Sequence, residues 1–98
     1  MVSSIQVVWT AEAENNLEEI CDFLRQRWTQ KEVFQLLQAI KGCESVIAKH
    51  PKAFKESSVR TKCRLALVHP NLTMVYKVED YQIIIIALFD NRANDPFR

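Results

Sequence analysis

The run Ile83-Ile84-Ile85-Ile86-Ala87-Leu88-Phe89 decides the fold, because it is the longest purely apolar stretch in the chain. It is far too short to span a bilayer as a helix, which needs about 20 apolar residues. A strand that is apolar on both faces is typical of a central position in a sheet. Residues 83–89 are therefore predicted to form a central strand.

The segments just before this run alternate with the period of two that is typical of strands. Every second side chain of residues 72–78 is large and apolar, and residues 63–67 repeat the pattern with Cys63, Leu65 and Leu67. Turn sequences at residues 69–71 and 79–80 separate the segments. The C-terminal half is therefore predicted to be a three-stranded antiparallel meander, followed by a polar tail over residues 90–98.

Toward the N-terminus, apolar residues recur at helical spacing in two segments. Residues 11–28 carry one apolar stripe, and Thr10 is placed to cap that helix. Thr29 and Glu32 form a capping-box pattern before a second stripe, which Pro51 ends. Because almost no loop separates the two helices, they are predicted to form an antiparallel hairpin.

Residues 5–9 alternate as a short strand, which we expect to join the sheet beside residues 83–89. The direction of this first strand does not follow from the sequence. The predicted fold class is α+β: an N-terminal strand, an antiparallel helical hairpin and a three-stranded meander, in one mostly antiparallel sheet with the hairpin packed on one face. Residues 1–98 have the length of a single domain.

The net charge of +1 does not by itself indicate a nucleic-acid-binding protein, but the charges are unevenly distributed. Acids dominate residues 12–22, and bases dominate residues 49–64. Cys21, Cys43 and Cys63 are far apart in the sequence, so we expect buried thiols of a reducing cytoplasm and no metal site. The first residues lack the pattern of a signal peptide, and we expect a cytoplasmic protein with no membrane partner.

With its elements in this order, the chain resembles the RelE/ParE superfamily of bacterial toxins over nearly its whole length. The likeness includes Trp9-Thr10-Ala11 before the hairpin, Ala48-Lys49-His50-Pro51 after it, and Met74-Val75-Tyr76-Lys77-Val78. It also includes residues 83–96, in which Arg92 stands just past the last strand and is followed by Asp95-Pro96. The resemblance implies a toxin of a type II toxin–antitoxin system, a cognate antitoxin bound to it in a hetero-oligomer, and no cofactor.

Two targets are open under this resemblance. Resemblance to the ParE members implies a protein that binds and inhibits DNA gyrase, and the long helical hairpin favours this branch. Resemblance to the RelE members implies a ribosome-dependent endoribonuclease that cuts messenger RNA without a metal. Such a reaction requires a base, phosphate-binding cations and an acid. A third alternative is a decayed toxin that retains only antitoxin binding.

The candidate site residues are cations. Arg92 follows the central strand, where its guanidinium is suited to bidentate phosphate binding, although an ion pair with Asp90 or Asp95 is equally compatible. If Cys63, Leu65 and Leu67 face the helices, then the bases that alternate with them share the open face of the sheet. That face would meet a target or an acidic antitoxin segment, although half-buried strands often carry such charges. The candidates for target or antitoxin binding are Lys52, Lys55, Arg60, Lys62, Arg64 and Arg92, and a nuclease would use Lys62, Arg64 and Arg92 in catalysis.

Several positions depart from the pattern of the nuclease members. Thr73 and Met74 stand where those members often carry an arginine, and the tail offers Phe97 where they have a histidine or tyrosine acid. Tyr76 shares a side of its strand with Met74 and is expected in the core. His50 is expected to be a helix-end residue rather than a catalyst. These departures favour gyrase binding.

A hairpin on one face leaves the other face of the sheet open. Its exposed apolar side chains are expected to be Val75, Ile84, Ile86 and Leu88, which would be a sizeable patch for a monomer. We expect an antitoxin segment to cover this patch, either as an added strand or as an amphipathic helix.

Overall fold

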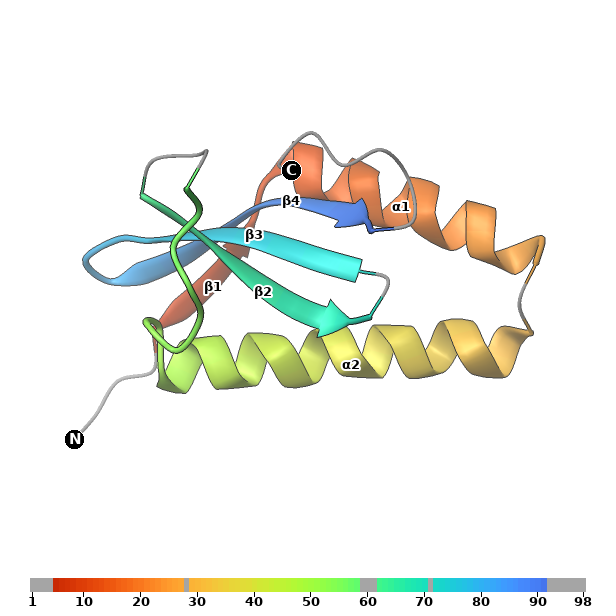
Figure 1. Ribbon diagram of the computed structural model, residues 1–98, viewed down its shortest axis with the longest axis horizontal. Helices are drawn as coiled ribbons and strands as arrows, with labels where there is room; N and C mark the ends of the chain where they lie inside the picture. The colour runs from red at the N-terminus through yellow and green to blue at the C-terminus, as the bar shows by residue number, and fades with distance from the viewer. Residues whose placement is uncertain (1–4, 28, 59–61, 71, 92–98) are drawn as a thin grey trace.

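The computed structural model describes residues 5–27, 29–58, 62–70 and 72–91. In chain order they form β1 (Gln6–Trp9), α1 (Ala11–Arg25), α2 (Gln30–Lys49), β2 (Cys63–His69), β3 (Leu72–Val78) and β4 (Gln82–Asp90) (Figure 1). The strands form one sheet in the order β1-β4-β3-β2. The α+β class, the meander and the central position of the apolar run are confirmed. The sequence left the direction of β1 open, and β1 is parallel to β4.

Both helices begin with the caps that the sequence predicts. The hydroxyl of Thr10 accepts a hydrogen bond from the backbone N–H of Ala13 at 3.1 Å. At Thr29 the capping box is complete, because its hydroxyl accepts from the N–H of Glu32 and its own N–H donates to the Glu32 carboxylate. These bonds satisfy N–H groups that have no partner inside a helix. The helix starts are therefore local properties of the sequence.

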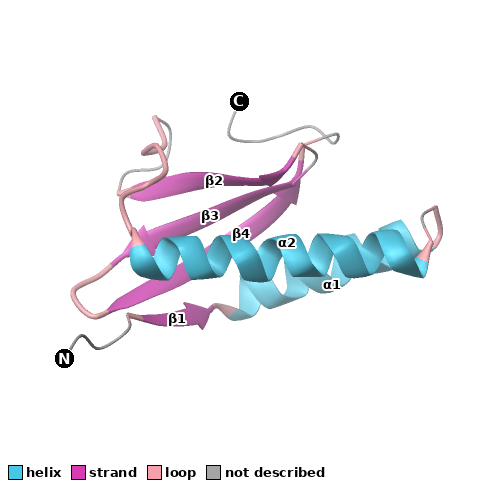
Figure 2. Cartoon of the chain, turned by 90° about the horizontal axis from the view of Figure 1, so that it is seen from below, coloured by secondary structure: helices cyan, strands magenta, loops and turns pink. Residues whose placement is uncertain are grey.

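The helices are antiparallel and take different positions against the sheet (Figure 1). α2 lies across the sheet, and α1 continues from the end of β1 and packs chiefly against β4 (Figure 2). The Asn16 side chain of α1 accepts a hydrogen bond from the backbone N–H of Leu88 at 3.1 Å, so α1 covers the part of β4 that β1 does not reach. One core joins both helices to one face of the sheet, and its fully buried members include Ala13, Ile47, Met74, Tyr76, Ile83 and Ile85.

A bulge in β4 changes which side chains face the helices. Val75 pairs with Ala87 and Tyr76 with Ile85, so Ile86 is an extra residue on its strand. The Thr10 hydroxyl donates to the carbonyl of Ile86 at 3.0 Å and thereby stabilises the irregular backbone. Beyond the bulge the alternation is reversed, and Leu88 packs in the helix-side core with 3% exposure. The expectation that Leu88 is exposed on the open face is wrong for this reason.

The expected orientation of β2 is also wrong. Ala66 and Val68 pack in the helix-side core, whereas Cys63 and Leu65 pack on the other face. Val75, expected to be exposed there, is buried, because it belongs to a small second cluster with Cys63 and Ala87. The open face is apolar enough to have a minor core of its own, so polarity alone does not distinguish the two sides of β2.

The one glycine of the chain, Gly42, lies within α2. It lies on the exposed side of α2, and a Cβ built there meets no atom within 4 Å. Gly42→Ala is therefore expected to increase the free energy of unfolding by about 1 kcal/mol, because glycine loses more backbone entropy in a helix. For a domain of this size, the melting temperature should rise by about 4–8 °C. Thermal unfolding followed by circular dichroism measures the change, and an unchanged or lower value would contradict it.

All three cysteines are buried free thiols, as predicted. Among the described residues, no helix is both long and apolar enough to cross a membrane. Burial raises the pKa of Cys43 from its ordinary value of 9.0 to about 11, and the Glu44 carboxylate adds to the rise. Folding therefore favours the protonated Cys43 thiol over the thiolate.

The raised pKa of Cys43 predicts a loss of stability in alkali. Because the folded pKa lies above the unfolded one, this contribution is complete below pH 9.0 and is lost as the pH rises toward about 11. A difference of two units corresponds to roughly 2–3 kcal/mol. Urea unfolding across this range measures the slope, with Cys43→Ala as the control. The pKa values of Cys21 and Tyr76 are raised too, so the control should keep part of the slope. An identical slope in both proteins would count against the assignment.

Candidate functional site

The predicted cations fall into three groups. Arg60 and Arg92 lie outside the described residues. Lys52 and Lys55 are exposed on the segment between α2 and β2, and Lys62 is exposed just before β2. Arg64 is half-buried and belongs to the helix side of β2, because it pairs with Tyr76 across the strands. The predicted strip of bases along the open face of β2 is therefore absent from the described part of that strand.

Arg64 supports the segment that carries Lys52 and Lys55. Its guanidinium donates to the Phe54 carbonyl at 2.6 Å and lies 3.4 Å from the Glu56 carboxylate. Two backbone bonds, from Leu65 N–H to the Lys55 carbonyl and from Ser57 N–H to the Cys63 carbonyl, attach the same segment to the outer edge of β2. Arg64 therefore has a structural role, because it holds the exposed lysines at a fixed place beside the sheet.

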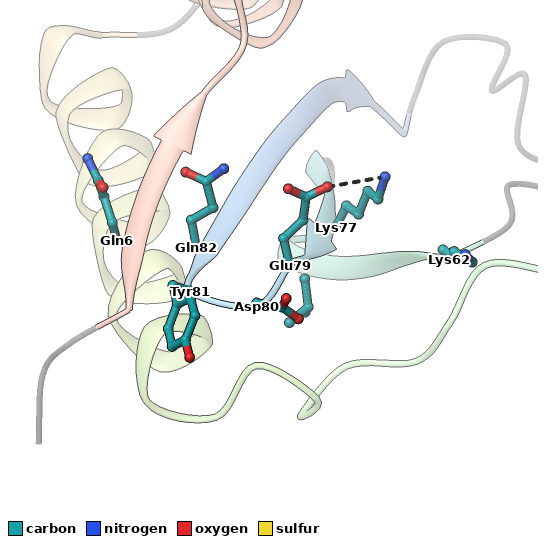
Figure 3. Close-up of a pocket in the computed structure, with 8 residues that line it drawn as sticks. Gln6, Lys62, Lys77, Glu79, Asp80, Tyr81 and Gln82 are labelled. Atoms are coloured by element: carbon teal, nitrogen blue, oxygen red, sulfur yellow. Dashed lines mark ion pairs between the residues drawn. The ribbon is translucent and has the colours of Figure 1, made fainter.

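Lys62 lines a polar pocket of about 690 Å³ at the end of the sheet that holds the β3–β4 turn. Lys77 lines the same pocket. Its side chain belongs to the open face of the sheet, because Lys77 pairs with Cys63 across the strands. Figure 3 shows the Lys77–Glu79 ion pair, 3.4 Å between Nζ and Oε2, on the same side as Gln6 and Gln82. Tyr81, which is 87% exposed, points away from them. The pocket offers two ammonium groups, of which one has a carboxylate partner.

Sequence reasoning missed Lys77 as a member of this site. The signal was present, because the period of two places Lys77 on the same side of its strand as Thr73 and Val75. The approach of Lys62 depended on the register between β2 and β3, which the sequence does not show. Lys62 has a φ of 66°, in the left-handed region that non-glycine residues rarely adopt. Lys62 takes up this conformation directly before β2.

The open face of the sheet is mainly apolar. Within the strands that the structure describes, the register gives it a single cation, Lys77. Leu67 is 62% exposed at the outer strand, and Ile84 and Ile86 are half-buried, so two of the predicted exposed side chains are partly accessible. The other side chains of this face include Val8, Leu65, Val75, Ala87 and Phe89.

The positions compared with the nuclease pattern serve packing. Met74 has no exposed surface, and Thr73 is buried and donates its hydroxyl proton to the Asn91 side chain at 2.8 Å. Tyr76 lies in the core, as predicted, and its hydroxyl donates to the Pro51 carbonyl at 2.8 Å. Burial raises the pKa of the Tyr76 phenol. Its proton is therefore held inside the protein rather than offered to a substrate.

The two histidines stand at opposite ends of α2. His50 caps the C-terminal end, as predicted, whereas His69 lines a small pocket with Glu32 and Gln35 near the N-terminal end. The helix between Glu32 and His50 is roughly 27 Å long from its rise per residue. The two imidazoles are thus too far apart to act as acid and base on one phosphate.

The sequence matches the family model for the ParE toxin of type II toxin-antitoxin system, parDE, over residues 7–96. No curated protein matches the chain in sequence.

Solved structures share the fold at low sequence identity. The chain is similar to the chromosomal ParDE toxin-antitoxin system from P. aeruginosa, with a TM-score of 0.76 and 15% identity over 88% of this chain and 95% of that one. It is also similar to the E. coli DinJ-YafQ toxin-antitoxin complex, with a TM-score of 0.63 and 9% identity over 92% and 96%. The YoeB dimer from Staphylococcus aureus gives a TM-score of 0.60 and 15% identity over 89% and 97%.

Proposed function

Because the chain belongs to the ParE toxin family of type II toxin–antitoxin systems, we propose that it acts by binding and inhibiting DNA gyrase rather than by cutting messenger RNA. The observation that supports binding is the apolar open face. A ribonuclease of this kind needs cations and an acid–base pair around one phosphate. On the open face, the described strands present the exposed Leu67, the half-buried Leu65, Ile84, Ile86 and Phe89, and a single cation, Lys77, a composition suited to contact with a protein.

The same face supports a cognate antitoxin as the partner. The structures similar to this chain include toxin–antitoxin complexes. Leu67 and its half-buried neighbours leave apolar surface that an antitoxin segment would cover. We expect the isolated toxin to be less soluble than its complex and to melt at a lower temperature, because binding to the folded state stabilises it. Equal solubility and equal melting behaviour would contradict this.

The exposed cations supply electrostatic complementarity for the target or for the antitoxin. We assign this role to Lys52, Lys55 and Lys62, and extend it to Arg60 and Arg92, which flank the described strands in sequence. Arg64 contributes by holding the lysine-bearing segment. Complementary charge mainly accelerates association and selects the partner. Removing a lysine should therefore slow binding, and removing Arg64 should also loosen the segment.

The experiment is a supercoiling assay with purified gyrase and the full chain. Inhibition at micromolar toxin is expected, and addition of the antitoxin encoded by the neighbouring gene should restore supercoiling. The variant Lys52→Glu/Lys55→Glu should inhibit less, whereas Lys31→Glu/Lys41→Glu makes the same charge change on the exposed side of α2 and should inhibit like the wild type. An absence of inhibition by the wild type would overturn the proposal.

A parallel measurement distinguishes the alternatives. Messenger RNA on stalled ribosomes should remain intact in the presence of the toxin. Cleavage that disappears in Arg92→Ala would instead assign the chain to the ribosome-dependent endoribonucleases. Expression without growth arrest, together with normal antitoxin binding, would identify a decayed toxin.

A further inference from the structure

A groove runs along α1 and is bounded by Leu37 of α2 and by Trp9 at the end of β1, away from the open face of the sheet. It has a volume of about 890 Å³. Its apolar floor consists of Leu17 and Cys21 of α1, Leu37 of α2, and Trp9 of β1. The Trp9 indole N–H donates to the Glu44 carboxylate of α2 at 2.8 Å, so the ring is fixed in place at one end of the floor. We name this feature the acidic groove.

The rim of the acidic groove carries negative charge. Glu14, Glu18 and Asp22 follow one another at intervals of four residues along α1, and all three are exposed. Arg25 is the one cation among the lining residues, and its Nη1 lies 2.9 Å from the Asp22 carboxylate. Three carboxylates and one guanidinium leave a formal charge of −2 along the groove. The Glu44 carboxylate adds negative charge beside Trp9.

The dimensions of the acidic groove match a helix. From Glu14 to Arg25 it follows α1 for roughly 16 Å, or about three helical turns. An amphipathic helix presents apolar side chains at intervals of three and four residues, which suits a floor formed by two helices and a strand end. The exposed Phe34 stands one turn before Leu37 on α2 and extends the apolar strip beyond the groove. A partner helix would cover it as well.

We infer that the acidic groove binds a basic amphipathic helix of a partner protein. Lysine or arginine side chains of that helix lie against Glu14, Glu18 and Asp22, and its apolar stripe contacts Leu17, Leu37 and Trp9. A nucleic acid is the wrong occupant, because its phosphates would meet the carboxylates of the rim. The inference does not depend on whether the toxin acts on gyrase, since it concerns a surface separate from the open face.

The test uses the full chain and a fluorescent synthetic peptide of leucine and lysine, amphipathic and about four helical turns long. Binding is measured by fluorescence anisotropy. The variant Glu14→Lys/Glu18→Lys reverses the rim and is expected to weaken binding about tenfold. The control variant Glu12→Lys/Glu19→Lys makes the same charge change on α1 at positions outside the groove. The two double variants are matched at the helix end, because each removes one acidic residue from the first turn of α1. It should bind within about twofold of the wild type.

Two further results complete the test. A peptide with glutamate in place of lysine should not bind, and the lysine peptide should slow amide hydrogen exchange in α1 and α2. Equal weakening by both double variants would reduce the interaction to general charge attraction and overturn the inference. Binding of the acidic peptide, or protection confined to the sheet, would overturn it as well. Thermal unfolding of each variant shows whether it is folded.

Discussion

Replacing Tyr76 by alanine is expected to lower the free energy of unfolding by about 3–5 kcal/mol. The ring has no exposed surface, and it packs edge-to-face against Phe54 with 6.3 Å between ring centroids. Phe54 belongs to the segment after α2, so the loss of Tyr76 leaves a cavity between that segment and the sheet. Urea unfolding measures the change, and a loss below about 1 kcal/mol would contradict the close packing of this ring.

The matched control is Tyr76→Phe, which keeps the ring and removes the hydrogen bond to the Pro51 carbonyl. A loss of about 1 kcal/mol is expected, because one neutral hydrogen bond is removed and a part-buried acceptor remains. Growth arrest should persist in this variant. Loss of toxicity without loss of stability would instead make the Tyr76 hydroxyl a catalytic group.

The second large effect is expected for Ile85→Ala, at about 3–4 kcal/mol. Ile85 has no exposed surface and pairs with Trp9 on one side and Tyr76 on the other, so no neighbour is placed to fill the space. Urea unfolding at neutral pH compares this variant with Ile84→Ala. The Ile84→Ala substitution makes the same side-chain truncation on the open face, where Ile84 is half-buried, and should lose about 1 kcal/mol.

This pair of substitutions tests which face of the sheet the helices cover. Equal losses would mean that the open face is covered as completely as the helix side. A larger loss for Ile84→Ala would reverse the assignment of the two faces. Addition of the antitoxin should increase the cost of Ile84→Ala specifically, if that partner covers the open face as proposed.

The elements of the fold follow from the sequence because their signals are local. Thr10 and Thr29 cap their own helices, and the apolar run of residues 83–89 forms the strand that lies between β1 and β3. The orientation of β2 was not predictable in this way. Arg64 turns to the helix side because the Phe54 carbonyl and the Glu56 carboxylate accept its protons there. These partners lie on a segment whose position only the tertiary structure defines.

In the candidate site, too, the charged residues could be predicted from the sequence, whereas their arrangement in space could not. The lysines of the exposed segment were predicted from their charge. The structure shows that they are exposed, and their role in binding stays a prediction. Lys77 was missed because its approach to Lys62 depends on strand register. Leu88 was placed on the wrong face because the bulge at Ile86 interrupts the period of two, and the groups that stabilise the bulge, Thr10 and Asn16, are distant in sequence. The acidic groove likewise combines side chains from three separate elements.

The parallel pairing of β1 with β4 means that the sheet is completed only after β4 has been synthesised. β4 is the last of the described strands to leave the ribosome, yet both β1 and β3 need it as a neighbour. Contacts between residues so distant along the chain form late and slowly. An unfinished polypeptide that lacks β4 therefore has neither the complete sheet nor the apolar open face, even if the helical hairpin has already formed. Newly made chains therefore complete the apolar face only after β4 has been synthesised, and a partner that recognises this face can bind only from that moment.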